Sequence, residues 1–166
     1  VQRFSPDGVF ELSWQMPVTA LGKPKGMGRD RDGNILVVEP HYQRVNVFSP
    51  LGKLVAQWGK PGTNAGEFTW PRAVAVNSRS EVLVSEYGLV ERVQRFTADG
   101  GFVTEWGSFG TGQGEFHRPA GVAVEWELLA PEERRPGNKM TFIPSCSGPT
   151  RHIWRTGMKR PKACTR

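Results

Sequence analysis

Long apolar runs are absent from this sequence of 166 residues. No stretch approaches the roughly 18 consecutive apolar residues that a membrane-spanning helix needs, so the sequence predicts no membrane span. No basic segment followed by an apolar one comes after Val1. We therefore expect no signal peptide in the chain as given, and the cellular location stays open. The 20 glycines and 13 prolines instead favour many short elements joined by turns.

Cysteine is almost absent as well. The two copies, Cys146 and Cys164, have 17 residues between them, with no C-x-x-C spacing and no histidine pair at zinc-ligand intervals. Structural zinc sites usually show such spacings, so the sequence predicts no structural metal and no cofactor. Nothing in the spacing indicates a disulfide, and the redox compartment stays open.

Net charge is missing from most of the chain. Residues 1–125 carry 13 basic and 13 acidic residues, whereas residues 126–166 carry nine basic and three acidic ones and account for the whole net charge of +6. Nucleic-acid-binding domains usually concentrate basic residues on their folded part. We therefore expect no nucleic-acid partner for residues 1–125 and a solvated basic tail after them.

An internal repeat is present instead. Residues 1–14, 45–59 and 93–107 align with spacings of 44 and 48, and residues 24–40, 71–87 and 119–125 align with spacings of 47 and 48. Two segment families that keep nearly the same period indicate a repeat architecture. The first family shares aromatic and glycine positions, namely Phe4, Phe48 and Phe96, Gly8, Gly52 and Gly100, and Trp14, Trp58 and Trp106.

One period contains four segments with strand character. Residues 73–76 are small and β-branched, residues 82–84 are apolar, and residues 92–96 and 102–106 alternate polar and apolar side chains. Such runs are typical of short strands joined by turns. Four antiparallel strands form a small sheet with two faces to bury, so the shared aromatic and valine positions are expected to pack between neighbouring sheets.

These segments resemble the NHL-repeat family. Its G-x-F-x-x-P, G-[IV]-A-V-D, [VI]-x-V-[AS]-[DE], N-x-R-[VI]-Q-x-F and D-G-x-F-x-x-x-[WF]-G elements recur here over residues 1 to about 125. The first of them appears at residues 66–71 and 114–119, the second at 121–125, the third at 36–39 and 83–86, and the fourth at 44–48 and 92–96. The turn at residues 77–81 departs from the pattern because it lacks the family's glycine.

The resemblance implies an all-β fold, a partial β-propeller with about two complete four-stranded blades and parts of two more. We expect half a blade in residues 1–14, complete blades in 24–59 and 71–107, and an inner strand in 119–125. Residues 126–166 are expected to be irregular, either disordered or aberrant in sequence. Propellers of this family close a ring of about six blades, so the chain is a fragment, a member of an assembly or an open arc. Open sheet edges then predict self-association.

Two acid–arginine pairs are candidate site residues, Glu39 with Arg44 and Glu86 with Arg92. In each pair the acid ends one strand and the arginine begins the next. One interpretation is an ion pair that clamps the hairpin, which at a protein surface contributes roughly 0–1 kcal/mol. The other places the acids at a loop-bearing face in contact with a ligand.

Further candidates lie in loops or at strand ends. The aromatic and cationic residues among them are of the kinds that anchor protein interfaces, although one, Trp70, could equally cap the core beside Pro71. Glu125 ends the innermost strand and is placed to contact a small ligand or to hydrate the channel, with Asp30 or Arg31 and Asn77 as its counterparts. The candidate binding residues at the loop face are Glu39, His41, Tyr42, Arg44, Trp70, Glu86, Tyr87, Arg92, Arg118 and Glu125.

Three functional interpretations follow. The first is a non-catalytic binding scaffold, with a protein as its partner. The second, from the resemblance to propeller lyases and hydrolases, is an enzyme, which needs a metal or acid–base set on the axis. His41, His117 and His152 do not recur at equivalent positions, so we expect no metal site and no catalytic residue. The third is RNA binding, which needs a basic face that the neutral blades do not provide.

Overall fold

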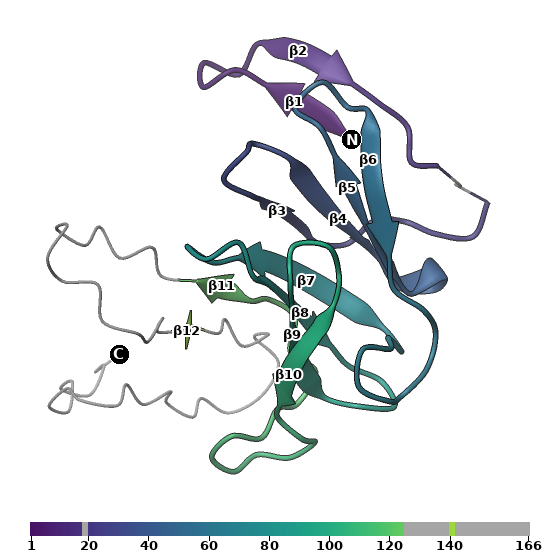
Figure 1. The fold of residues 1–166 in the computed structure, drawn as a ribbon, viewed down its shortest axis with the longest axis vertical. Coiled ribbons are helices and arrows are strands. Elements are labelled where there is room, and N and C mark those ends of the chain that lie inside the picture. The colour runs from purple at the N-terminus through teal and green to yellow at the C-terminus, as the bar shows by residue number, and fades with distance from the viewer. Residues whose placement is uncertain (18–19, 125–139, 142–166) are drawn as a thin grey trace, which may run out of the picture.

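The computed structural model describes residues 1–17, 20–124 and 140–141, and these residues form mainly β-strands and turns (Figure 1). Among them one short 3-10 helix is present, η1 (Pro40–Tyr42). The strands are β1 (Gln2–Phe4), β2 (Phe10–Ser13), β3 (Met27–Arg29), β4 (Ile35–Glu39), β5 (Arg44–Phe48), β6 (Leu54–Trp58), β7 (Pro71–Val76), β8 (Val82–Glu86), β9 (Arg92–Phe96), β10 (Phe102–Trp106), β11 (Ala123–Val124) and β12 (Met140–Thr141).

The strands form two four-stranded sheets flanked by two pairs. The four-stranded sheets have the orders β3-β4-β5-β6 and β7-β8-β9-β10, and every strand in them is antiparallel to its neighbour. The β1–β2 and β11–β12 pairs are antiparallel as well. The predicted all-β architecture, with two complete four-stranded units and parts of two more, is confirmed.

The first turn of each four-stranded sheet is organised by the same side-chain device. In the β3–β4 turn, Oδ1 of Asp30 accepts the backbone N–H of Asn34 at 2.8 Å. In the β7–β8 turn, Oδ1 of Asn77 accepts the N–H of Glu81 at 2.9 Å. The first turn has Gly33 at φ 84°, and the second turn has Ser80 at the equivalent position, at φ 62°. The less regular turn that the sequence predicts therefore keeps the same backbone conformation at some steric cost.

The two four-stranded sheets pack against each other along β7, which lies against both β3 and β4. Glycine permits the closest approach, because a Cβ atom on Gly26 would lie 2.6 Å from backbone atoms of Arg72 and Ala73. The buried core between the sheets consists of Leu36, Val38, Val45, Val47, Phe68, Val74, Val76, Val82, Val84 and Phe96, with Trp58 partly buried against it.

The recurring tryptophans and turn glycines meet between successive sheets. A Cβ atom on Gly52 would lie 2.8 Å from the ring of Trp14, and one on Gly100 would lie 2.5 Å from the ring of Trp58. Trp58 also packs on Phe96, with ring centroids 4.9 Å apart. The prediction that these aromatic positions pack between sheets is confirmed for Trp14 and Trp58. Phe4, in the same series, is 51% exposed.

Antiparallel order divides the connections between two edges. The turns at residues 30–34, 49–53, 77–81 and 97–101 lie at one edge. The loops at 40–43 and 87–91 and the connections at 20–26, 59–70 and 107–119 lie at the other, which we call the loop face. All of the candidate site residues within the described ranges lie at or beneath the loop face.

Candidate functional site

Glu86 and Arg92 form a buried ion pair beneath the loop face. They are opposite each other in the β8–β9 ladder, and Nε of Arg92 donates to Oε1 of Glu86 at 2.5 Å. The Glu86 side chain is fully buried and that of Arg92 is 6% exposed. Oε2 of Glu86 accepts the backbone N–H of Thr69 at 2.9 Å. The predicted clamp is therefore present, but valuing it as a surface pair is wrong, because both charges are out of contact with water.

Arg92 also holds the connection that precedes its own sheet. Its Nη1 donates to the carbonyl of Thr63 at 2.9 Å, and its Nη2 donates to the carbonyls of Asn64 and Glu67 at 3.1 and 3.0 Å. Gln94 on β9 adds two bonds to the same segment, accepting the N–H of Gly66 at 2.8 Å and donating to the carbonyl of Glu67 at 2.7 Å. The fork of the guanidinium thus satisfies backbone groups of residues 63–67 that no strand pairs with.

Glu39 and Arg44 repeat the pair in the preceding sheet with different partners. They are cross-strand neighbours in the β4–β5 ladder, and Nε of Arg44 donates to Oε2 of Glu39 at 2.6 Å. Asn46 donates to the same oxygen at 2.6 Å and accepts from Gln57 at 2.6 Å. Within the described residues, Oε1 of Glu39 and Nη2 of Arg44 are buried without a hydrogen-bond partner. This pair therefore does not hold its connection as Arg92 does.

Aromatic side chains line the loop face above these pairs. The rings of His41 and Trp70 meet edge to face, with centroids 4.7 Å apart. The guanidinium of Arg44 lies 4.6 Å from the ring centroid of Tyr42, whose hydroxyl accepts the N–H of Leu21 at 2.9 Å. His41 is exposed, whereas Tyr42 and Trp70 are half-buried. This edge-to-face contact joins the two sheets at the loop face.

A second group surrounds Tyr87, directly after β8. The guanidinium of Arg72 lies 4.9 Å from the Tyr87 ring centroid and that of Arg118 lies 5.1 Å from it. Arg118 has a left-handed backbone conformation, with φ 55°. The buried carboxylate of Glu91 accepts the backbone N–H of Arg118 at 2.6 Å. Two cations are thus positioned on one aromatic ring at the ends of the innermost strands.

One carboxylate of the loop face has a shifted pKa. A hydrogen bond and charge from Lys60, with its Nζ 3.1 Å from Oε1 of Glu67, lower the pKa of Glu67 below the ordinary 4.5. The backbone N–H of Asn64 lowers that pKa further. At the opposite edge, the hydroxyl of Thr97 lowers the pKa of Asp99 in the same direction. Both carboxylates therefore stay ionised at neutral pH and act as local turn acceptors.

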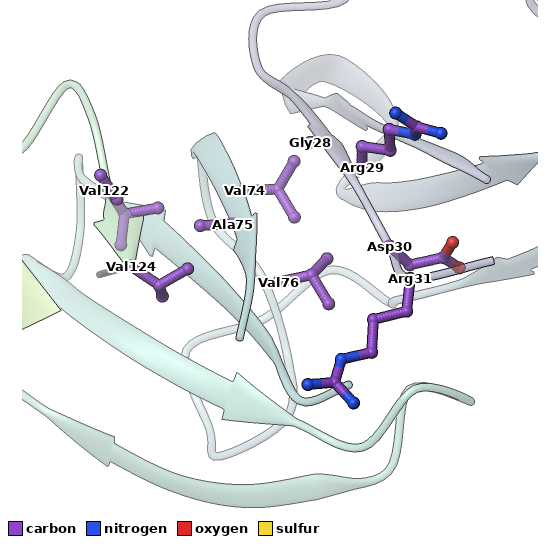
Figure 2. Close-up of a pocket in the computed structure, with 10 residues that line it drawn as sticks. Gly28, Arg29, Asp30, Arg31, Val74, Ala75, Val76, Val122 and Val124 are labelled. Atoms are coloured by element: carbon purple, nitrogen blue, oxygen red, sulfur yellow. The ribbon is translucent and has the colours of Figure 1, made fainter. Parts of the chain in front are cut away.

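The innermost strands border a hollow of about 660 Å³ (Figure 2). Its lining comes from β3, β7 and β11 and the residues next to them, and includes Val74, Val76, Val122, Val124 and Arg31. Asp30 and Asn77, the predicted counterparts of Glu125, hold their own turns. Glu125 itself lies outside the described residues. The wall of the hollow therefore combines aliphatic side chains from β7 and β11 with charged side chains at the end of β3.

Two kinds of feature are absent from the part of the chain that the structure describes. Within residues 1–17, 20–124 and 140–141, no group of three or more histidine, cysteine, aspartate or glutamate side chains is arranged to hold a metal ion. In the same ranges no helix is both long enough and apolar enough to cross a membrane.

Nine of the ten predicted site residues lie in the described ranges, and the structure separates them into two layers. Glu39, Glu86 and Arg92 are buried and hold the fold. His41, Tyr42, Arg44, Trp70, Tyr87 and Arg118 reach the surface. Sequence reasoning missed Arg72, which follows Pro71, and Glu91, next to Arg92. The signal for Arg72 was its position at the start of the innermost strand, one residue from the loop face.

Comparison with known proteins identifies the fold. No protein-family model and no curated protein matches the chain. A solved streptogramin B lyase is 24% identical with a TM-score of 0.54, over 74% of this chain and 37% of that one. Virginiamycin B lyase from Staphylococcus aureus is 16% identical with a TM-score of 0.54, over 88% and 48%. A protein of unknown function from Bacteroides caccae is 17% identical with a TM-score of 0.52, over 75% and 42%.

The chain is a partial β-propeller. Each four-stranded sheet is a blade, and β3, β7 and β11 are the innermost strands of three successive blades. The chain spans 37%, 42% and 48% of the lengths of these three solved proteins. At these identities the likeness concerns the fold alone, and it does not extend to the activity of the lyases.

Proposed function

We propose that the chain is an NHL-type propeller arc that binds a protein partner through its loop face and carries out no catalysis. In this proposal residues 1–125 make up most of the blades and residues 126–166 a basic tail, from which Met140–Thr141 pairs with β11. The observation that carries it is the set of pre-oriented aromatic and cationic side chains at the loop face. These are His41, Tyr42, Trp70, Tyr87 and Arg118.

The residue types support a protein partner. Tyrosine, tryptophan and arginine are enriched among the few residues that dominate interface energies. Their contacts across neighbouring blades, such as that between His41 and Trp70, limit the rotamer entropy that binding would otherwise remove. Beneath them, the buried pair of Glu86 and Arg92 holds the backbone next to Trp70 and Tyr87 through the Thr69 N–H and the β8–β9 ladder.

A propeller enzyme is the second candidate, and the lyases among the solved neighbours favour it. An enzyme of this kind would need free acid–base groups or metal ligands facing the hollow. The described acids Asp30, Glu39 and Glu86 already accept hydrogen bonds from their own turns and hairpins. These acids therefore have structural roles, which favours the binding module over the enzyme.

Self-association is part of the proposal. In the described residues β1 pairs only with β2, and β11 pairs only with β12, so each pair leaves strand edges unpaired. Phe4, Val9 and Phe10, in and beside the β1–β2 pair, are exposed. Unpaired edges beside exposed apolar side chains favour association with another chain. Analytical ultracentrifugation should show a concentration-dependent dimer or larger species, and a monodisperse monomer would contradict this part.

Affinity capture with paired variants tests the main proposal. The tagged chain, His41→Ala with Tyr87→Ala, and a matched variant at the opposite edge, Leu51→Ser with Asp99→Ala, are incubated with lysate of the source organism. We expect one protein to be enriched by the unaltered chain and by the opposite-edge variant, and to be lost with the loop-face variant. Equal capture by all three forms would exclude the loop face as the binding surface.

Metal analysis tests the enzyme alternative. Elemental analysis of the purified chain is expected to give no stoichiometric transition metal. A stoichiometric metal that survives dialysis, together with turnover of a lyase substrate, would favour the enzyme over the binding module.

A further inference from the structure

We propose that Arg72 and Arg118, both positioned against the ring of Tyr87, form a carboxylate-binding site for an acidic segment of the protein partner. This inference rests on the proposed function, because it names the chemistry that the loop face recognises. It adds Arg72, which sequence reasoning did not single out, and gives Tyr87 the role of holding both cations.

The geometry brings the two guanidiniums to one ring. Arg72 is the second residue of β7 and Arg118 precedes the innermost strand of the next blade, so they come from neighbouring blades. Their guanidinium carbons lie 4.9 and 5.1 Å from the centroid of Tyr87. Stacking on an aromatic face leaves the N–H groups at the edge of a guanidinium free to bind a carboxylate in its plane.

The charges of both arginines are uncompensated locally. Within the described residues neither guanidinium forms an ion pair or donates a hydrogen bond. The two acids nearest to Tyr87 along the chain are committed elsewhere. Glu86 is held by Arg92 and Gln94, and Glu91 accepts the backbone N–H of Arg118 rather than its side chain. By contrast, Arg92 is fully used inside the blade.

The backbone at Arg118 is held in an uncommon conformation. At φ 55° a residue with a Cβ atom has a steric cost of roughly 1–2 kcal/mol. The buried carboxylate of Glu91 holds this conformation through a 2.6 Å hydrogen bond to the Arg118 N–H. Strain that the surrounding structure maintains is frequent at binding sites. Here it places the guanidinium of Arg118 over Tyr87.

An acidic peptide fits this site better than a nucleic acid does. Recognition of a phosphate backbone draws on many basic residues spread over a surface. The first 125 residues carry equal numbers of basic and acidic residues. The site offers two guanidiniums against the ring of Tyr87, whose backbone N–H donates to the carbonyl of Trp70. A short segment with one or two carboxylates and an apolar neighbour matches that arrangement.

Fluorescence anisotropy with a labelled hexaglutamate peptide tests the inference on the full chain. We expect saturable binding that weakens roughly tenfold or more in Arg72→Gln with Arg118→Gln, the range expected for charge-assisted hydrogen bonds. Arg79→Gln, which removes an exposed arginine at the opposite edge, should change affinity less than about twofold because that surface charge is screened from the site. Equal losses in the two variants, or no binding by the unaltered chain, would overturn the site.

Tyr87 variants test the positioning role. Tyr87→Phe keeps the ring and should keep the affinity for hexaglutamate, whereas Tyr87→Leu should lower it several-fold. Circular dichroism must show the same fold for both. Equal affinities for the two variants would show that stacking on Tyr87 does not position the arginines.

Competitors distinguish the carboxylate from other anions. A labelled six-nucleotide RNA and inorganic phosphate should bind more weakly than hexaglutamate, and either one binding more tightly with the same arginine dependence would overturn the assignment. The inference and the proposed function can fail separately. If the His41 and Tyr87 variant loses partner capture but the unaltered chain does not bind hexaglutamate, this inference is wrong and the proposed function stands. If hexaglutamate binds but the loop-face variant captures the partner as well as the unaltered chain does, the proposed function is wrong and this inference stands.

Discussion

Arg92 donates from Nε to Oε1 of Glu86 at 2.5 Å, and the two residues face each other across the β8–β9 ladder at its loop-face end. The same arginine reaches three backbone carbonyls in the connection that leads into its own blade. One side chain therefore joins a hairpin to a segment 25 or more positions earlier. The stability of this blade depends on a polar network as well as on its apolar core.

Replacing Arg92 by methionine should strongly destabilise the protein. The change leaves the buried carboxylate of Glu86 without its cation and removes three hydrogen bonds to backbone carbonyls of residues 63–67. Breaking a buried pair in this way costs about 3–5 kcal/mol. Urea unfolding measures the loss. The control is Arg3→Met, which breaks the exposed pair with Glu11 and should cost about 1 kcal/mol or less. Equal losses would contradict the buried network.

Gly100→Ala should cost more than Gly8→Ala, although both glycines occupy equivalent turn positions at φ 90° and 79°. The positive φ costs roughly 1–2 kcal/mol in either case. A Cβ atom at residue 100 would also lie 2.5 Å from the Trp58 ring, whereas nothing lies within 4 Å at residue 8. Overpacking adds about 1–3 kcal/mol. The difference between the two melting temperatures isolates the contact between blades, and equal melting temperatures would contradict it.

Ser80→Gly should stabilise the protein, by roughly 0.5 kcal/mol. Serine at φ 62° carries the steric cost that glycine avoids, and the greater entropy of glycine in the unfolded chain offsets part of the gain. Ala98→Gly, in an exposed turn at the same edge without a positive φ at that residue, should be slightly destabilising. Thermal unfolding of the two variants should show shifts of opposite sign. Shifts of the same sign would show that Ser80 is not strained.

The carboxyl of Glu67 should titrate below the ordinary 4.5, because Lys60 and the Asn64 N–H favour its ionised form. A carboxyl whose folded-state pKa is lowered contributes stability above its unfolded pKa and loses that contribution as the pH falls through its folded pKa. Lys60→Met should therefore raise the pKa of Glu67, as measured by carbon NMR titration of its carboxyl group. Lys53→Met, at the opposite edge, should leave it unchanged.

The repeat made most of the fold predictable from sequence. Alternation in residues 92–96 and 102–106 and the apolar run at 82–84 correspond to β9, β10 and β8. Successive side chains of a strand point to opposite faces, so alternation marks an extended backbone. The recurring positions of Trp58 and Gly100 in the repeat also correspond to a contact between blades. Sequence reasoning valued the Glu86–Arg92 pair as a surface interaction because spacing alone does not reveal burial.

The candidate site was only partly predictable. Tyr87 and Arg118 stood out as residue types in loops, but their meeting with Arg72 depends on how two blades pack. The hold of Arg92 on residues 63–67 is a contact across more than 20 positions that no local pattern encodes. The left-handed conformation of Arg118 was also unexpected, because neither glycine nor asparagine marks it.

The segment at residues 59–70 determines where a blade of this chain could be cut for transfer into another protein. It follows β6 in the sequence, yet its backbone is anchored to Arg92 and Gln94 on β9. Phe68, from the same segment, is fully buried against Phe96 of that later strand. A graft that starts at Pro71 would keep Arg92 and Gln94 but leave out the segment that they bind, whereas one that starts at Gly59 includes both.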